Sequence, residues 1–206
     1  MISFTKNFLF IHVQKTAGHS IRDEIRPYTD KRVEAEMQYK APLQDFGVVR
    51  DNGKWKLGLH SSYENYKNRL ETDVFDNLYK FSTIRNPYAR VVSHHYDKVA
   101  HCGAEDTRSS FLQTAQSVAT LRQLWCVGDE ALDANLNRVI RFENLQADFD
   151  KVCDEIGINR IVLPKKNKGT KSHSDYLKRY DDETLQIVRD RFAEEIEYGN
   201  YAAENV

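Results

Sequence analysis

The chain has few cysteines and no cysteine pair. Cys102, Cys126 and Cys153 are its only thiols, they are widely spaced, and no CxxC motif occurs. An odd number of separated cysteines suggests neither a disulfide framework nor a zinc ribbon. We therefore interpret them as free thiols, buried or half-buried, of a protein in a reducing compartment.

A long apolar run is also missing. Near the start the longest apolar stretch covers residues 8–13, far short of the ~20 residues that a membrane-spanning helix needs. No small-residue cleavage site follows it, so the stretch does not have the pattern of a signal peptide. From the sequence we expect no integral membrane segment and a cytoplasmic protein.

Neither sign of charge dominates the chain. Lysine and arginine number 30 against 31 aspartate and glutamate residues, which leaves a formal net charge of -1. This balance argues against a dedicated nucleic-acid-binding protein. The average hides a segregation, because residues 165–180 are rich in lysine and residues 181–206 are acidic. A small, concentrated anion site is therefore compatible with the total.

The order of apolar patterns predicts an α/β fold. Residues 8–13 are almost continuously apolar, which is typical of a parallel strand buried on both faces. Further strands are expected at 78–84 and 138–142, and helices at 19–26, after Asn86-Pro87, and from Asn144 to Gly157. With no repeats and 206 residues, we expect a single domain, 1–206. Its fold would be a P-loop-like three-layer fold with a central, mainly parallel sheet flanked by helices.

Four further elements complete this prediction. Residues 48–55 suggest a hairpin that turns at Asn52-Gly53, and residues 61–70 suggest a helix. After a polar loop at 101–108, Ser109 or Ser110 is expected to cap a helix that continues to Leu121. A single amphipathic helix is expected to include residues 185–196, because its apolar residues recur at helical spacing.

The most informative segment is 10–21, in which a buried strand leads through a turn at Gly18 into a helix. The start of such a helix presents unpaired backbone N–H groups and the positive end of its dipole to an anion. Lys15 adds a full positive charge, and the hydroxyls of Thr16 and Ser20 add donors. The segment therefore has the groups that a phosphate or sulfate site requires. An ordinary strand–turn–helix corner with an exposed lysine is the alternative interpretation.

This segment is not a Walker A loop. GxxxxGK[ST] places the lysine after its second glycine, whereas Lys15 precedes the only glycine of the loop, Gly18, by three residues. No apolar strand ending in aspartate offers a ligand for Mg²⁺. The pattern therefore disfavours a magnesium-dependent nucleotide hydrolase.

Residues 15–20, Lys-Thr-Ala-Gly-His-Ser, resemble the first motif of the PAPS-dependent sulfotransferases. The resemblance is to the carbohydrate (type 2) branch, whose motif reads approximately PKTAGTS. Gln14 replaces the proline and His19 replaces a threonine. The resemblance implies that this loop binds the 5′-phosphosulfate of 3′-phosphoadenosine 5′-phosphosulfate (PAPS). The implied cofactor-binding residues are Lys15, Thr16, Ala17, Gly18, His19 and Ser20.

A second motif of this family matches residues 84–93. Arg85 follows a predicted strand, Asn86-Pro87-Tyr88 follows, and Ser93 comes eight residues after the arginine, as in the family. The resemblance implies that Arg85 and Ser93 bind the 3′-phosphate, for which a guanidinium fork and a hydroxyl are suitable donors. Arg85 and Lys15 both follow strand ends, where ligands bind in open α/β sheets. Arg90 fits a helix-surface ion pair and a cofactor contact equally well.

Two later segments extend the resemblance. Residues 140–145 are similar to the family's R-F/Y-E-x-L stretch, in which we interpret Glu143 as mainly structural. The basic residues 165–173 are similar to a loop that closes over the cofactor, although a solvated lysine-rich loop is the alternative. The contacts that the resemblance implies there are Lys168, Gly169, Thr170 and Lys171.

Sulfuryl transfer needs a stabilised leaving group and a base for the proton of the acceptor. Lys15 can stabilise charge on the leaving oxygen of adenosine 3′,5′-bisphosphate, and no metal is required. A histidine suits the base because its pKa lies near neutrality. We choose His60, since carbohydrate sulfotransferases often place this histidine in the middle region of the chain; a helix-capping or surface histidine is the alternative.

The expected function is therefore transfer of a sulfuryl group from PAPS to an acceptor hydroxyl, which the resemblance places on a carbohydrate. A nucleotide or adenylylsulfate kinase is a second hypothesis, and a catalytically silent nucleotide-binding module is a third. Trp55, Tyr63 and Tyr66 are suited either to stack on sugar rings or to pack in the core.

Overall fold

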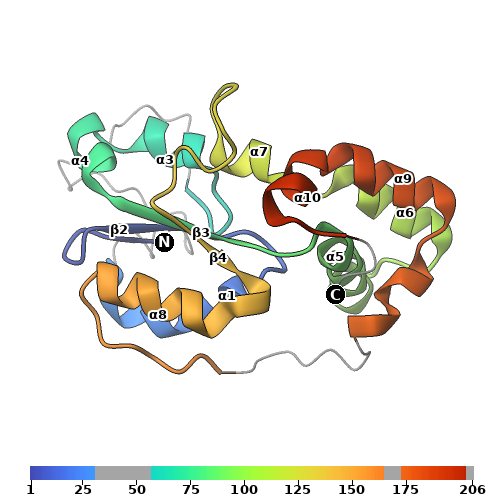
Figure 1. The fold of residues 1–206 in the computed structure, drawn as a ribbon, viewed down its shortest axis with the longest axis horizontal. Coiled ribbons are helices and arrows are strands. Elements are labelled where there is room, and N and C mark those ends of the chain that lie inside the picture. Colours follow the sequence, from blue (N-terminus) through green and yellow to red (C-terminus); the bar gives the residue numbers. More distant parts are fainter. Residues whose placement is uncertain (31–56, 165–172, 203–206) are drawn as a thin grey trace.

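The centre of the protein is a mainly parallel β-sheet (Figure 1). The computed structural model describes residues 1–30, 57–164 and 173–202. In this part of the chain the strands follow the order β1-β2-β3-β4, with β2, β3 and β4 parallel and β1 antiparallel to β2. Their bounds are Ile2–Ser3 for β1, Phe8–Ile11 for β2, Tyr79–Ile84 for β3 and Arg138–Arg141 for β4. The three expected strands are confirmed, while β1 is too short to leave a pattern in the sequence.

Helices cover both faces of the sheet, which confirms the three-layer α/β fold (Figure 1). On one face, α1 and α8 enclose a core around Phe10, Phe81 and Phe149. On the other face, α3, α4 and α7 enclose a core around Ile11, Tyr66 and Trp125. These helices span Gly18–Ile25 (α1), Tyr63–Arg69 (α3), Thr72–Asn77 (α4), Leu121–Trp125 (α7) and Leu145–Glu155 (α8).

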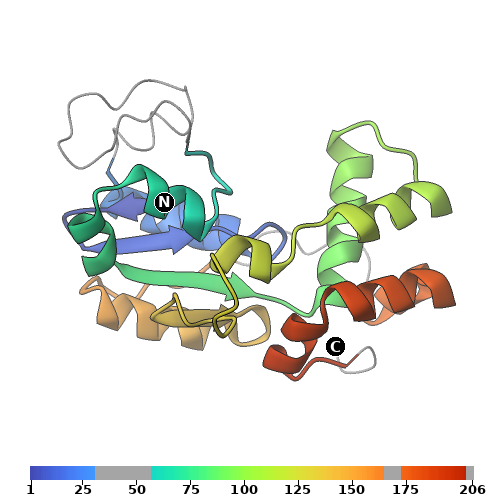
Figure 2. The same ribbon diagram turned by 90° about the horizontal axis from the view of Figure 1, so that it is seen from above.

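A group of helices beyond the carboxyl end of β3 has a core of its own. Figure 2 shows these helices beside the sheet rather than stacked on it. Their shared core includes Val91, Phe111, Val188 and Phe192. We call this group the helical lobe. It consists of α5 (Pro87–His101), α6 (Arg108–Ser117), the 3-10 helix η3 (His173–Arg179), α9 (Asp182–Arg191) and α10 (Ala193–Gly199).

The starts of the helices show where the capping residues alone predicted the boundary of a helix. Asn86 caps α5 by accepting a hydrogen bond from Tyr88 N at 2.9 Å, and Pro87 is the first helical residue, as predicted. The expected helix α6 is present, but its cap is Thr107, which accepts from Ser110 N, and it ends at Ser117 rather than continuing to Leu121. At α8, Asn144 occupies the cap position without a capping bond, and its amide donates to Asp148 Oδ1 instead. Two short 3-10 helices, Arg26–Tyr28 (η1) and Phe142–Asn144 (η2), complete the described elements.

The predicted last helix is in fact two helices. The chain leaves helical geometry at Phe192, with φ -112° and ψ 22°, between α9 and α10. The break does not interrupt the apolar spacing, because both Val188 and Phe192 pack in the core of the lobe. Periodicity alone therefore could not reveal it. The expected hairpin at 48–55 lies outside the described residues.

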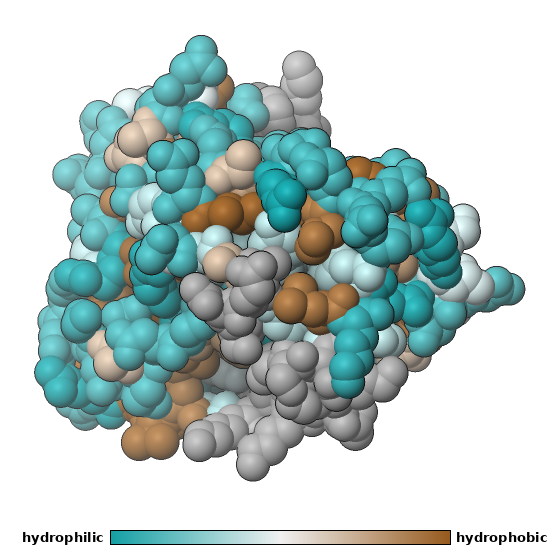
Figure 3. Space-filling view, turned by 45° about the vertical axis from the view of Figure 1, so that its right-hand side comes forward, coloured by the Kyte–Doolittle hydropathy of each residue, from teal (hydrophilic) through white to brown (hydrophobic). Residues whose placement is uncertain are grey.

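The surface is mainly polar. The face in Figure 3 carries mostly hydrophilic side chains with small apolar patches between them. Among the residues that the structure describes, the exposed large apolar side chains are Val127 and Val162. None of the helices in this part of the chain has the length and apolar character needed to cross a membrane.

Candidate functional site

The loop after β2 has a strained backbone. Lys15 and Ala17 adopt φ angles of 63° and 65°, in the left-handed region, although neither is glycine. Each such residue costs ~1–2 kcal/mol, and strain of this kind concentrates at binding and catalytic sites. The surrounding structure must therefore hold the loop in this conformation.

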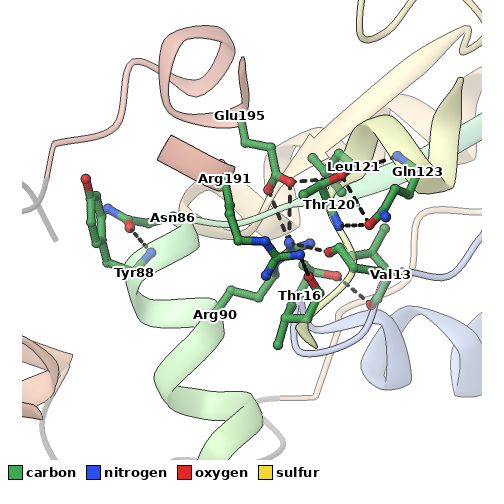
Figure 4. A network of polar contacts seen from close by, with 12 residues as sticks. Val13, Thr16, Asn86, Tyr88, Arg90, Thr120, Leu121, Gln123, Arg191 and Glu195 are labelled. Carbon is green, nitrogen blue, oxygen red and sulfur yellow. Dashed lines mark hydrogen bonds and ion pairs between the residues drawn. The ribbon is translucent and has the colours of Figure 1, made fainter. Parts of the chain in front are cut away.

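Thr16 anchors the loop from the inside. Its hydroxyl donates to the carbonyl of Val13 at 2.8 Å (Figure 4). The same hydroxyl lies 2.5 Å from the Thr83 hydroxyl of β3. Because this hydroxyl is buried and directed into the protein, the group that Thr16 can offer to an anion is its backbone N–H.

Gly18 allows the loop to lie against a buried histidine. A Cβ atom at this position would stand 1.9 Å from Cδ2 of His12, so any larger residue would collide with the ring. Helix α1 begins at Gly18 and Ala17 is its cap residue. The N–H groups of Gly18 and His19 precede the first intrahelical bonds, which is the arrangement that binds anions. Ser20 is buried in the same turn.

Arg85, in the second motif, contacts the loop that contains the first motif. It follows β3, the parallel neighbour of β2, and its Nη1 donates to the carbonyl of Lys15 at 3.0 Å. Its guanidinium also lies over the ring of Phe142, 4.2 Å from the ring centre. Burial lowers the pKa of Arg85 to about 10, with the charge of Glu143 acting in the other direction. Arg85 therefore stays charged at neutral pH, next to the loop that carries Lys15.

The ammonium of Lys15 has a partner that the sequence analysis missed. Its Nζ lies 2.7 Å from Oδ1 of Asp97, on α5. Asp97 comes four residues after Ser93, a spacing that places both on one side of the helix. This spacing was the available signal, but only the fold shows that this side faces the loop. Ser93 itself is half-buried.

Arg90 belongs to a buried ion pair. Its Nη2 lies 3.3 Å from Oε2 of Glu195 and donates to the carbonyl of Ala119 at 2.8 Å. Glu195 also accepts a hydrogen bond from Leu121 N at 2.6 Å, so that it joins α10 to α7 and α5 (Figure 4). Both charged side chains are only 2% exposed. Of the two interpretations, the structure shows the ion pair, although in the interior rather than on the helix surface.

His60 lies beside the loop. Its Nδ1 is 3.0 Å from the carbonyl oxygen of His12. A carbonyl can only accept, so Nδ1 carries the proton and the neutral ring has its lone pair on Nε2. Burial lowers the pKa of His60 below its ordinary value, while the bond to His12 acts in the opposite direction. At neutral pH the ring is therefore neutral and able to accept a proton.

Three histidines from two separate segments meet at this point. The rings of His60 and His19 lie 4.5 Å and 5.0 Å from the ring of His12, measured between centres. His12 is 2% exposed, and neither of its ring nitrogens has a hydrogen-bond partner in the described part of the protein. Burial lowers the pKa of His12 to about 2, which keeps it neutral.

Glu143 connects the second motif to the C-terminal residues. Its carboxylate accepts from Asn86 N at 3.1 Å and from the Tyr201 hydroxyl at 3.0 Å. The side-chain amide of Asn86 donates to the carbonyl of Ala202 at 3.2 Å. These contacts agree with a structural role for Glu143. The residues Lys168, Gly169, Thr170 and Lys171 lie outside the described part of the chain.

The two candidate tyrosines for sugar stacking are core residues. Tyr63 and Tyr66 are both buried, and the Tyr66 hydroxyl accepts a hydrogen bond from the amino group of Met1. Trp55 lies outside the described residues. The core alternative therefore holds for both tyrosines.

Comparison with known proteins identifies the family. A model of the sulfotransferase family matches residues 1–202. The chain belongs to the sulfotransferase family. No curated protein and no solved structure in the searches matches it. Membership supports sulfuryl transfer as the general chemistry and agrees with the observed three-layer α/β fold.

Proposed function

We propose that this sulfotransferase moves a sulfuryl group from PAPS to the hydroxyl of a carbohydrate. The contact between Arg85 Nη1 and the Lys15 carbonyl carries the proposal. It joins the two segments that resemble the 5′-phosphosulfate and 3′-phosphate motifs, at the carboxyl edge where α/β sheets bind ligands. The acceptor class rests on the resemblance of the first motif to the carbohydrate branch.

The donor set is suited to a nucleotide with phosphate groups at both ends. Lys15 and the N–H groups at the start of α1 can hold the 5′-phosphosulfate, because they combine a full charge with helix-end donors. Arg85 offers a planar fork to the 3′-phosphate. When bound, PAPS supplies an activated sulfuryl group on a phosphate leaving group.

The residues of the chain then have distinct roles. Nε2 of His60 accepts the proton of the acceptor hydroxyl as its oxygen bonds to sulfur. A donor held by these residues would supply the sulfuryl group, and its bridging oxygen would leave with the electron pair of the broken bond to sulfur. Lys15 stabilises the charge that develops there, since an ammonium near a developing oxyanion lowers the barrier. The products are a sulfate ester and adenosine 3′,5′-bisphosphate.

Calorimetric titration with adenosine 3′,5′-bisphosphate, adenosine 5′-phosphate and ATP tests the donor. We expect the bisphosphate to bind most tightly, and Arg85→Lys to reduce its advantage over adenosine 5′-phosphate, because lysine lacks the planar fork. Lys15→Met should weaken binding and turnover. Lys151→Met, which removes one charge from α8, is the control and should change neither. Equal affinity for all three nucleotides would overturn the donor assignment, and tightest binding of ATP would favour the kinase hypothesis.

The pH profile of turnover with PAPS tests the base. The neutral form of His60 is active and its pKa lies below the ordinary 6.5, so kcat/KM should fall as the pH is lowered, with a midpoint below 6.5. His60→Ala should lower kcat by about 10²–10⁴-fold and remove this dependence. Tight bisphosphate binding without turnover on any carbohydrate would instead identify a silent binding module. Full turnover of His60→Ala would disprove the base assignment.

A further inference from the structure

Two side chains of α5 hold the loop that carries Lys15. Gln14 Oε1 lies 2.6 Å from Nε2 of His94, and Lys15 Nζ lies 2.7 Å from Oδ1 of Asp97. His94 and Asp97 are three residues apart, so they share one side of the helix. This side of α5 therefore contacts two neighbouring loop residues, Gln14 and Lys15.

Lys15 is consequently fixed at both of its ends. Its carbonyl accepts from Arg85, and its ammonium pairs with Asp97. The side chains of this pair are 24% and 42% exposed. Ion pairs with this degree of solvent access are weak, so a stronger anion can take the ammonium from the carboxylate.

Asp97 is charged in this arrangement. Partial desolvation acts to raise the pKa of its carboxyl group, but the hydrogen bond and charge of Lys15, together with nearby histidines, outweigh that effect and leave the pKa below its usual value. The nearby histidines are His101 and His94. Asp97 thus offsets the charge of Lys15 at a site proposed to bind an anion.

We propose that Asp97 is a positioning residue that holds Lys15 against α5 and yields it to the nucleotide, and that its carboxylate thereby limits nucleotide affinity. This inference rests on the proposed function. An anion that reaches Lys15 must either displace the carboxylate or share the ammonium with it. Both cases weaken binding of the donor and of the bisphosphate product, and weaker product binding favours release.

Asp97→Asn tests this role because it removes the charge and keeps an oxygen that can accept from Lys15. In calorimetric titration we expect the variant to bind adenosine 3′,5′-bisphosphate about three- to tenfold more tightly, the range for one partly exposed charge. KM for PAPS should fall in parallel. In a Lys15→Met background, Asp97→Asn should give less than half of this gain, since the ammonium is absent.

Asp154→Asn is the matched control. It removes one carboxylate from a half-exposed pair with Arg160 and should leave nucleotide affinity unchanged. Damage to the fold would weaken binding, so a gain separates positioning from a merely structural role.

The outcomes that overturn the inference differ from those that overturn the proposed function. Unchanged or weaker bisphosphate binding by Asp97→Asn, with a wild-type protein that binds, overturns the role of Asp97 alone. An equal gain in the Lys15→Met background shows a general charge effect and also overturns it. A folded wild-type protein that does not bind the bisphosphate overturns the donor assignment, and this inference with it.

Discussion

The loops after β2 and β3 reach the same edge of the sheet by different physical means. The loop after β2 contains two non-glycine residues in left-handed geometry and lies against the ring of His12, whose two nitrogens have no hydrogen-bond partner among the described residues. The segment after β3 begins α5 with a regular cap at Asn86 and a proline at the first helical position. The first loop is strained, and the second is relaxed.

The relaxed segment supports the strained one. Residues 14 and 15 are held by three side chains of this segment, those of Arg85, His94 and Asp97. Thr16 contacts Thr83, at the end of β3. A strained loop persists only where its surroundings determine it, and here they come mostly from β3 and α5. The conformation of the first loop is therefore a property of the pair of segments.

The largest loss of stability is expected when the buried ion pair that anchors α5 is broken. Glu195→Ala leaves the charge of Arg90 buried without its partner and should lower the free energy of unfolding by about 3–5 kcal/mol. Urea denaturation measures this loss. Glu194→Ala is the control, because Glu194 pairs with Arg122 at the surface, and its loss should stay below about 1 kcal/mol. Equal losses for both variants would contradict the structural role of the buried pair.

A smaller effect is expected in the strained loop itself. Gly18→Ala forces a methyl group into the ring of His12 and should cost about 1–3 kcal/mol of stability, the usual range for overpacking. Adding His12→Ala removes the colliding ring, so Gly18→Ala should cost less in that background. A double-mutant cycle measures the difference, and strictly additive effects would rule out this explanation for the glycine.

The smallest changes in stability are expected from two glycine substitutions, one in each segment, which compare the segments directly. Ala17→Gly relieves a left-handed alanine and should stabilise the protein by about 0.5–1 kcal/mol. Ala89→Gly, in α5, should destabilise it by about 1 kcal/mol, because glycine costs backbone entropy and loses packing in a helix. Thermal unfolding of the two variants gives the signs. Destabilisation by both would show that the loop after β2 is not strained at Ala17.

The candidate site was only partly predictable. Lys15 and Arg85 both follow strands, so their meeting at one edge could be expected from a parallel sheet. The position of His60 beside His12 could not, because a histidine between segments has no periodic signal. Asp97 lies on the same side of α5 as Ser93, but nothing local indicated that this side faces Lys15.

Local sequence was enough to predict the order of strands and helices, the cap of α5 and the two motifs, because apolar spacing, capping residues and motif residues act over a few neighbouring positions. Three other features became visible in the folded protein: Arg90 is buried with Glu195, the last helix breaks at Phe192, and Asp97 pairs with Lys15. These outcomes depend on contacts between residues far apart in the chain. Their free energies come from burial and charge pairing, which exist only once the helical lobe has packed beside the sheet.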